Sequence, residues 1–319
     1  MNPMAWRLMW RQQRWELTIL IGGSLVVAAA MAFVAWQVPV TVDGIRTCGV
    51  GAPSYADLPA TCRSLVDWGN VWTAATPILT GVATIAPFGV GLFLGAPLVS
   101  REIEKRTAPM AWSLSLSRRA WLLGRVLPMA VVIAIVLLLV GQASEALQAA
   151  AYPDGRGFMD YGSRGPLVAA RGLAIFGIGV LVGLVTGRML PAILVTVLGA
   201  IAVFGGVEYA RSQLLRAEAT WIEVNPEGNG FAQIAMVYDS GYLDDATGEA
   251  ITSQQAFERF PEEFGPTGDG MPPGMTMTYL TTPPEQYPFF VARESGVLVG
   301  VLVVAAGLAL LMIRSRRPL

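Results

Sequence analysis

A group of charged side chains lies between two long apolar runs of the sequence. It consists of Arg101, Glu102, Glu104, Lys105, Arg106, Arg118, Arg119 and Arg125. Short cytoplasmic loops of membrane proteins are enriched in basic residues, which explains the arginines. That enrichment does not explain the two glutamates, or the apolar Trp112 and Leu114 between the charged ends. Carboxylates beside an apolar stretch are typical of a segment that docks onto another polypeptide.

Several kinds of chemistry are excluded by composition. The chain has no histidine and only two cysteines, which rules out Ser-His-Asp and Cys-His catalysis and a zinc site made of cysteines alone. The single lysine, Lys105, has no glycine-rich loop before it, so there is no Walker A motif. We therefore predict no catalytic residue, no metal site and no cofactor in this chain. The predicted spans contain no aspartate, which disfavours an intramembrane enzyme, and no nucleic-acid partner is expected.

The composition is that of an integral membrane protein: 54% of residues are hydrophobic and 14% charged, with a mean hydropathy of +0.53. Six stretches reach the roughly 20 residues that cross a bilayer. They are residues 17–40, 71–99, 121–144, 166–188, 190–212 and 294–313. The expected fold is an all-α polytopic bundle: 1–216 hold the first five spans, 217–292 an extracellular cap, and 293–319 the sixth span and tail. Spans four and five abut at Arg188–Pro191, which predicts a tight hairpin.

Charge placement predicts the orientation. With both termini cytoplasmic, thirteen basic and three acidic residues fall on the inner side, as the bias of short loops requires. The first apolar run is followed by Trp36-Gln37-Val38-Pro39 and not by a small-residue cleavage site, so we expect an uncleaved span. The 21 arginines against one lysine fit a GC-rich bacterial genome, and the expected location is the bacterial plasma membrane.

Residues 2–16 precede the first span and carry Arg7, Arg11 and Arg14 at helical spacing among tryptophans that include Trp10. This pattern predicts an amphipathic helix in the cytoplasmic interface of the membrane. The alternative is a positively charged anchor with no further role.

Cys48 and Cys62 fall in the same predicted exterior loop. An oxidising exterior favours a disulfide between them, which by the chain-entropy model contributes about 3 kcal/mol. Two unpaired thiols are the alternative.

The second span contains Pro77, Pro87 and Pro97, interleaved with glycines. Each proline removes a backbone hydrogen bond and favours a bend. We expect a kinked helix packed inside the bundle that moves with the charged segment after it; static bends are the alternative.

Ionisable residues are rare within the spans and are expected to be paired. We predict that Arg171 pairs with Glu145 or Glu208 as a structural clamp toward the outer face. Alternatively, Glu208 lines a substrate exit. In the fourth span, Gly179, Gly183 and Gly187 form a small-residue line, better suited to packing within one subunit than to a dimer seam. Gly296 and Gly300 repeat the pattern in the last span.

The exterior segment from Ala217 to Ala292 carries twelve acidic residues, one basic residue and many aromatics. Its aromatic content predicts a small folded unit rather than disorder. Ser253 followed by Gln254–Phe264 is typical of a capped helix. The unit is either a lid or partner-binding surface over an exit, or a solvated acidic decoration.

Two motifs resemble the permease subunits of ABC type-2 exporters. The first follows the order Gly-x-Pro-x-x-x-Arg-Glu-x-Glu-x-x-Thr, then Trp-Ser, then Ser-Arg-x-x-Trp, at Gly95, Pro97, Arg101, Glu102, Glu104, Thr107, Trp112, Ser113, Ser117, Arg118 and Trp121. The second is Trp10-Arg11-Gln12-Gln13-Arg14, similar to the opening of many such permeases. Lys105-Arg106 stands where that family usually has a glycine, so the local turn is expected to differ.

The resemblance implies that residues 101–117 are a coupling segment that contacts a separate ATPase. Arg101, Glu102, Glu104, Thr107, Trp112, Leu114 and Arg118 would make this contact, supported by Trp10, Arg11 and Arg14. It further implies export driven by two ATPase copies that bind ATP and Mg, with a second permease copy or a similar subunit. Because the spans supply few polar groups, we expect an amphipathic or lipid-like cargo such as a drug, antibiotic or peptide. The rival hypothesis is a membrane sensor or scaffold that transports nothing and uses the cap as its receptor domain.

Overall fold

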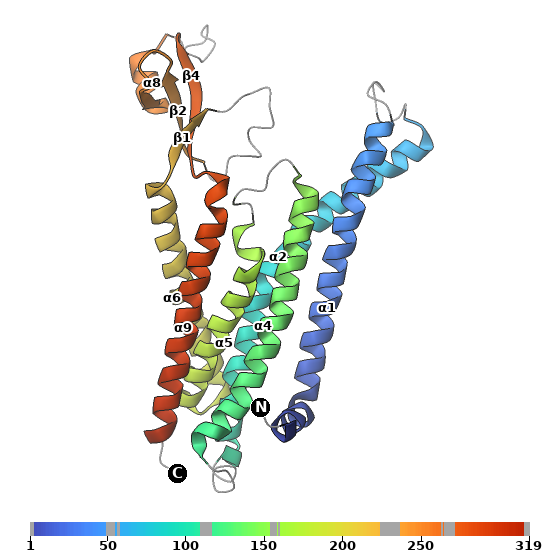
Figure 1. Ribbon diagram of the computed structural model, residues 1–319, viewed down its shortest axis with the longest axis vertical. Helices are drawn as coiled ribbons and strands as arrows, with labels where there is room; N and C mark the ends of the chain where they lie inside the picture. Colours follow the sequence, from blue (N-terminus) through green and yellow to red (C-terminus); the bar gives the residue numbers. More distant parts are fainter. Residues whose placement is uncertain are drawn as a thin grey trace. The chain divides into compact units, whose positions relative to one another are not determined.

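Six long helices dominate the computed structural model of the chain (Figure 1). The structure describes residues 3–48, 55, 58–108, 117–153, 158, 160–223, 237–262, 264 and 272–315; the side chains of 3–12, 284 and 315 are outside this description. The helices are α1 (Pro3–Thr47), α2 (Ala60–Glu104), α4 (Arg118–Ala151), α5 (Pro166–Thr186), α6 (Met189–Ala217) and α9 (Tyr287–Ser315). Each is long and apolar enough to cross a membrane, which confirms the predicted all-α polytopic class.

The contacts divide the chain into two compact units. The first comprises Met1–Ala151, Asp160–Gly205 and Val291–Leu319; the second comprises Tyr152–Met159 and Gly206–Phe290. α6 and α9 therefore contribute residues to both.

In the first unit, α5 is the buried central helix. In its most apolar stretch 72% of the residues are buried, against 17% in α6 and 22% in α9. Close approach of α2 makes this possible: a Cβ added at Gly183 would lie 2.6 Å from the Ala96 carbonyl oxygen, and one at Gly95 would lie 2.6 Å from that of Phe176. The expected packing of Gly179 and Gly183 within one subunit is thus confirmed.

Three glycines differ from the expected packing. Gly187 adopts φ +63°, and its N–H bonds the Gly183 carbonyl, so it ends α5 as a left-handed cap instead of extending the seam. Gly296 and Gly300 in α9 have no neighbouring atom within 4 Å of an added Cβ, so within the described residues they do not repeat the close packing of α5.

Several helix ends differ from the predicted span ends. α1 runs through Pro39 to Thr47, and α2 begins at Ala60, so both extend well past the predicted limits of 17–40 and 71–99. A proline inside a helix removes one hydrogen bond but does not have to end the helix when packing continues on both sides. Here Gly44 lies against Leu65 and Gly69 against Ile45, with added-Cβ distances of 3.1 and 3.3 Å. Packing between the two helices therefore continues beyond the apolar runs.

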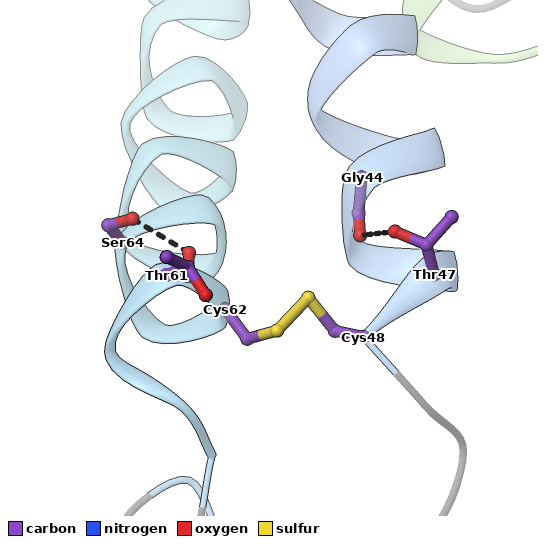
Figure 2. The surroundings of a disulfide bond; sticks show 6 residues. All are labelled: Gly44, Thr47, Cys48, Thr61, Cys62 and Ser64. Atoms are coloured by element: carbon purple, nitrogen blue, oxygen red, sulfur yellow. Dashed lines mark hydrogen bonds between the residues drawn. A yellow bond between two sulfur atoms is a disulfide. The ribbon is translucent and has the colours of Figure 1, made fainter.

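The extended ends of α1 and α2 are joined by a Cys48–Cys62 disulfide with a Cα–Cα distance of 5.8 Å, which confirms the predicted pairing. Figure 2 shows the bond between two helix termini, beside hydrogen bonds from Thr47 to the Gly44 carbonyl and from Ser64 to the Thr61 carbonyl, each 2.7 Å. The bond closes the end of a helical hairpin.

The second unit contains a four-stranded antiparallel sheet that the sequence analysis did not predict. Its strands are β1 (Thr220–Glu223), β2 (Val237–Asp244), β3 (Ala250–Thr252) and β4 (Met275–Thr281), in the order β1-β4-β2-β3. Backbone N–H groups of Ala246 and Thr247 bond the Asp244 carboxylate in the β2–β3 turn and lower its pKa. Tyr242, Ile251, Ala256 and Met275 form a small core.

The predicted 254–264 helix is shorter than expected. α8 runs from Ser253 to Arg259, and its N-cap is Thr252, not Ser253. Thr252 and Gln255 form a capping box, in which each side chain bonds the other residue's backbone N–H. Pro261 follows the end of the helix, at a position where a proline cannot donate the next helical bond.

Candidate coupling site

The last turn of α2 places three charged side chains against three other parts of the bundle. The first is Arg101, whose Nη1 donates to Glu16 Oε1 on α1 at 3.1 Å. Both side chains are partly exposed, so the pair contributes little stability. What it provides is a specific connection between the end of α2 and the start of the first span.

Glu102 forms an ion pair with Arg125 on α4, and its backbone carbonyl accepts from Thr107 Oγ1 at 3.2 Å. The Arg125 guanidinium lies over the Trp121 ring, 5.0 Å from its centroid, so the ring restricts the arginine. Ser117 starts α4 by accepting from the Ala120 N–H at 3.1 Å. The Ser-Arg-x-x-Trp motif thus supplies a cap at Ser117 and, one turn on, the ring that positions Arg125.

Glu104 Oε2 accepts from the backbone N–H of Met189 at 2.9 Å. Met189 is the first residue of α6, and a carboxylate at a helix N-terminus is stabilised by the unpaired N–H groups there. Arg101, Glu102 and Glu104 therefore connect one helical turn to α1, α4 and α6. We refer to these three residues with Glu16, Arg125 and Met189 as the helix-end hub.

Glu102 and Glu104 were expected to contact a separate ATPase, whereas both have partners within their own chain. Glu16, Arg125 and Met189 were not predicted as part of this site. Arg125 lies one helical turn after Trp121, a spacing that places ring and guanidinium on one face. No sequence pattern near Met189 indicated that its backbone N–H bonds Glu104, because this contact depends on how the α5–α6 hairpin packs against α2.

Other predicted coupling residues lie at the edge of this site. Trp112 and Leu114 lie outside the described residues, as do the side chains of Trp10 and Arg11. Arg118 is the first residue of α4, and the exposed Arg14 lies 5.6 Å from the centroid of the Trp15 ring. The backbone of α1 leaves the helical region at Gln13, with φ −120° and ψ 20°. The break in α1 therefore lies within the predicted interface helix of residues 2–16, shortly before the predicted first span.

A cavity of about 410 Å³ adjoins the helix-end hub. Gln13 and Glu16 of α1, Arg101 and Glu102 of α2, and Met129 of α4 are among the residues that line it. Phe93, Leu94, Pro97, Leu98 and Met189 complete its apolar wall. The lining therefore combines charged and apolar side chains.

α2 is one continuous helix through Pro77, Pro87 and Pro97. Pro87 and Pro97 are buried, and Pro87 lies near Gly172 of α5. The hydroxyls of Thr76, Thr80 and Thr84 each bond the carbonyl four residues earlier, a pattern that bends helices slightly. Movement at these prolines stays a prediction.

The predicted partners of Arg171 were wrong. Its Nε and Nη2 donate to Glu294 Oε1 on α9, at 3.1 and 2.7 Å, and its Nη1 donates to the Gly162 carbonyl at 3.2 Å. Glu208 instead pairs with Arg211 on the same helix, and Glu145 lies 3.9 Å from Arg164. Glu294 was overlooked because it is the first residue of the predicted sixth span, where a carboxylate is expected to face water.

The comparisons with known proteins identify the family. The model of the family described as ABC-2 membrane transporter related matches residues 21–211, which is more than half of the chain and includes the helix-end hub apart from Glu16. No curated protein and no solved structure matches the chain. With the six spans and the connected end of α2, this match establishes that the chain belongs to the ABC-2 membrane transporter related family and is a transmembrane subunit of an ABC transporter.

Proposed function

We propose that this chain forms the membrane pathway of an ATP-driven exporter for amphipathic compounds. A separate ATPase, which binds ATP and Mg, acts on the segment between α2 and α4. The complex would contain two ATPase subunits and a second permease copy, and the inner face would carry both termini.

The observation that supports this proposal best is the helix-end hub. Residues 105–117 follow directly on the turn that connects α2 to α1, α4 and α6. A force on that segment therefore reaches three helices through Arg101, Glu102 and Glu104, and reaches α5 through the tight glycine seam with α2. An ordinary cytoplasmic loop would not need such connections.

In the proposed cycle, ATP binding closes the ATPase dimer and displaces the segment 101–117. Because Glu104 bonds the first N–H of α6, this displacement changes the position of α6 relative to α2. α6 is little covered by the rest of the chain, so it can move against lipid or a second copy without disturbing the core. An amphipathic cargo fits spans whose ionisable groups are few and paired.

The test is substrate-stimulated ATP hydrolysis by the chain copurified with the nucleotide-binding subunit encoded beside it. Glu104→Gln weakens the acceptor at the α6 N-terminus and is expected to reduce the stimulation about tenfold, equivalent to about 1.4 kcal/mol. Glu208→Gln removes an exposed carboxylate elsewhere and serves as the matched control. Wild-type stimulation in Glu104→Gln would contradict the coupling role, and a chain that recruits no ATPase would contradict the function itself.

A further inference from the structure

The cavity beside the helix-end hub has the size and lining of a small-molecule site. Its volume of about 410 Å³ falls within the range of roughly 300–1,000 Å³ found for ligand pockets. Phe93, Leu94 and Met129 supply apolar surface, whereas Gln13, Glu16 and Glu102 supply polar atoms. A ligand that fills it must therefore have one apolar and one polar end.

Two of the four polar residues that line the cavity are carboxylates. The carboxylates of Glu16 and Glu102 lie on the same lining. Arg101 is the one lining cation among the described residues, and it already donates to Glu16. A carboxylate is a strong acceptor for a charged donor on a ligand.

We propose that this cavity binds an amphipathic amine in its protonated form. The ammonium group donates to the carboxylates of Glu16 and Glu102, and the apolar body lies against Leu94 and Met129. The two carboxylates favour a positively charged donor, so a primary ammonium is preferred to a neutral amide or a carboxylate on the same body. This inference rests on the proposed export function and names the class of substrate.

Occupancy of the cavity also bears on the helix-end hub. Glu16 and Glu102 belong to both, and each forms an ion pair with an arginine there. An ammonium group beside them competes for the same carboxylate oxygens. Bound ligand thus alters the connections between α2, α1 and α4 that carry force from the ATPase, which gives cargo a direct route to stimulate hydrolysis.

The test uses one fluorophore with three end groups, and the full chain in lipid nanodiscs without an ATPase. Dansylcadaverine carries a primary amine, its N-acetyl derivative is neutral, and dansyl-aminocaproic acid carries a carboxylate. We expect saturable binding of the amine and at least about tenfold weaker binding of the other two, as the loss of a hydrogen bond to a charged group implies. Equal binding of all three would overturn the proposal.

Two variants locate the binding. Leu94→Trp fills the cavity from a partly buried position and is expected to weaken amine binding about tenfold or more. Ile85→Trp makes the same kind of change at an exposed position of the same helix and is expected to leave it unchanged. Amine binding that Leu94→Trp does not weaken would place the site elsewhere. Because no ATPase is present, this result is independent of the coupling test: either proposal can fail alone.

Discussion

At the scale of single residues, the pairing of charges depends on three-dimensional packing that sequence spacing cannot provide. Arg171 and Glu294 lie 123 positions apart, and both are nearly buried, at 8% and 6% exposure. The need for a partner was predictable, because an unpaired charge inside a membrane is expensive. The identity of the partner was not, since it depends on which helix packs beside α5.

The buried pair predicts an asymmetry between single and double substitution. Glu294→Gln removes the charge that compensates Arg171 and is expected to destabilise the bundle by about 3–5 kcal/mol. Replacing both residues by methionine is expected to cost much less, because no buried charge remains without its partner. Thermal unfolding in detergent, followed by size-exclusion fluorescence, measures both.

Glu208→Gln is the control for this comparison. Glu208 pairs with Arg211, but the Glu208 side chain is exposed, so this pair is expected to contribute only about 0–1 kcal/mol to the free energy of unfolding. A Glu294→Gln protein as stable as Glu208→Gln would show that the buried pair is not a clamp.

At the scale of elements, the number of spans was predictable, whereas several of their limits and the sheet were not. Apolar runs of about 20 residues have few alternatives in a membrane, so all six helices were found. The prediction missed that α1 extends to Thr47 and that α2 begins at Ala60. These ends lie beyond the apolar runs, and contacts between the two helices and the disulfide stabilise them there. β1 pairs with β4 across a long separation, with Thr220 opposite Thr281, and no local pattern specifies such a pairing.

The two glycine pairs of α5 and α9 give a matched prediction about helix packing. An alanine at Gly179 or Gly183 would place its Cβ 2.7 or 2.6 Å from backbone atoms of Ala96, so α2 and α5 must separate. We expect a loss of about 1–3 kcal/mol in each case. Alanine at Gly296 or Gly300 meets no atom within 4 Å and is expected to be neutral or slightly stabilising, because alanine favours the helix. Equal effects on melting temperature at the two pairs would contradict the assigned seam.

At the scale of the whole molecule, charge and aromatic positions together indicate how the chain sits in a membrane. Trp15 and Trp36 of α1 are both exposed, at 69% and 64%. They lie 21 residues apart, which corresponds to about 32 Å along a helix. That distance matches the roughly 30 Å of a hydrocarbon core, and tryptophan favours both of its interfaces. Trp68 and Trp72 stack at 5.3 Å beside Phe33, at the same end of α1 as Trp36. The basic residues between 101 and 125 favour the inner side, so the helix-end hub would face the cytoplasm and the disulfide would face outward.

This orientation predicts which thiols a membrane-impermeant maleimide reaches in intact cells. After mild reduction, Cys48 and Cys62 are expected to be labelled, since their helix ends project past the tryptophans toward the exterior. A single cysteine placed at Arg106, in a chain whose native cysteines are serine, is expected to react only after the membrane is permeabilised. Arg106 directly follows the helix-end hub, so the same measurement locates the proposed ATPase contact. Labelling of the Arg106 position in intact cells would reverse the orientation and remove the segment 101–117 from reach of ATP.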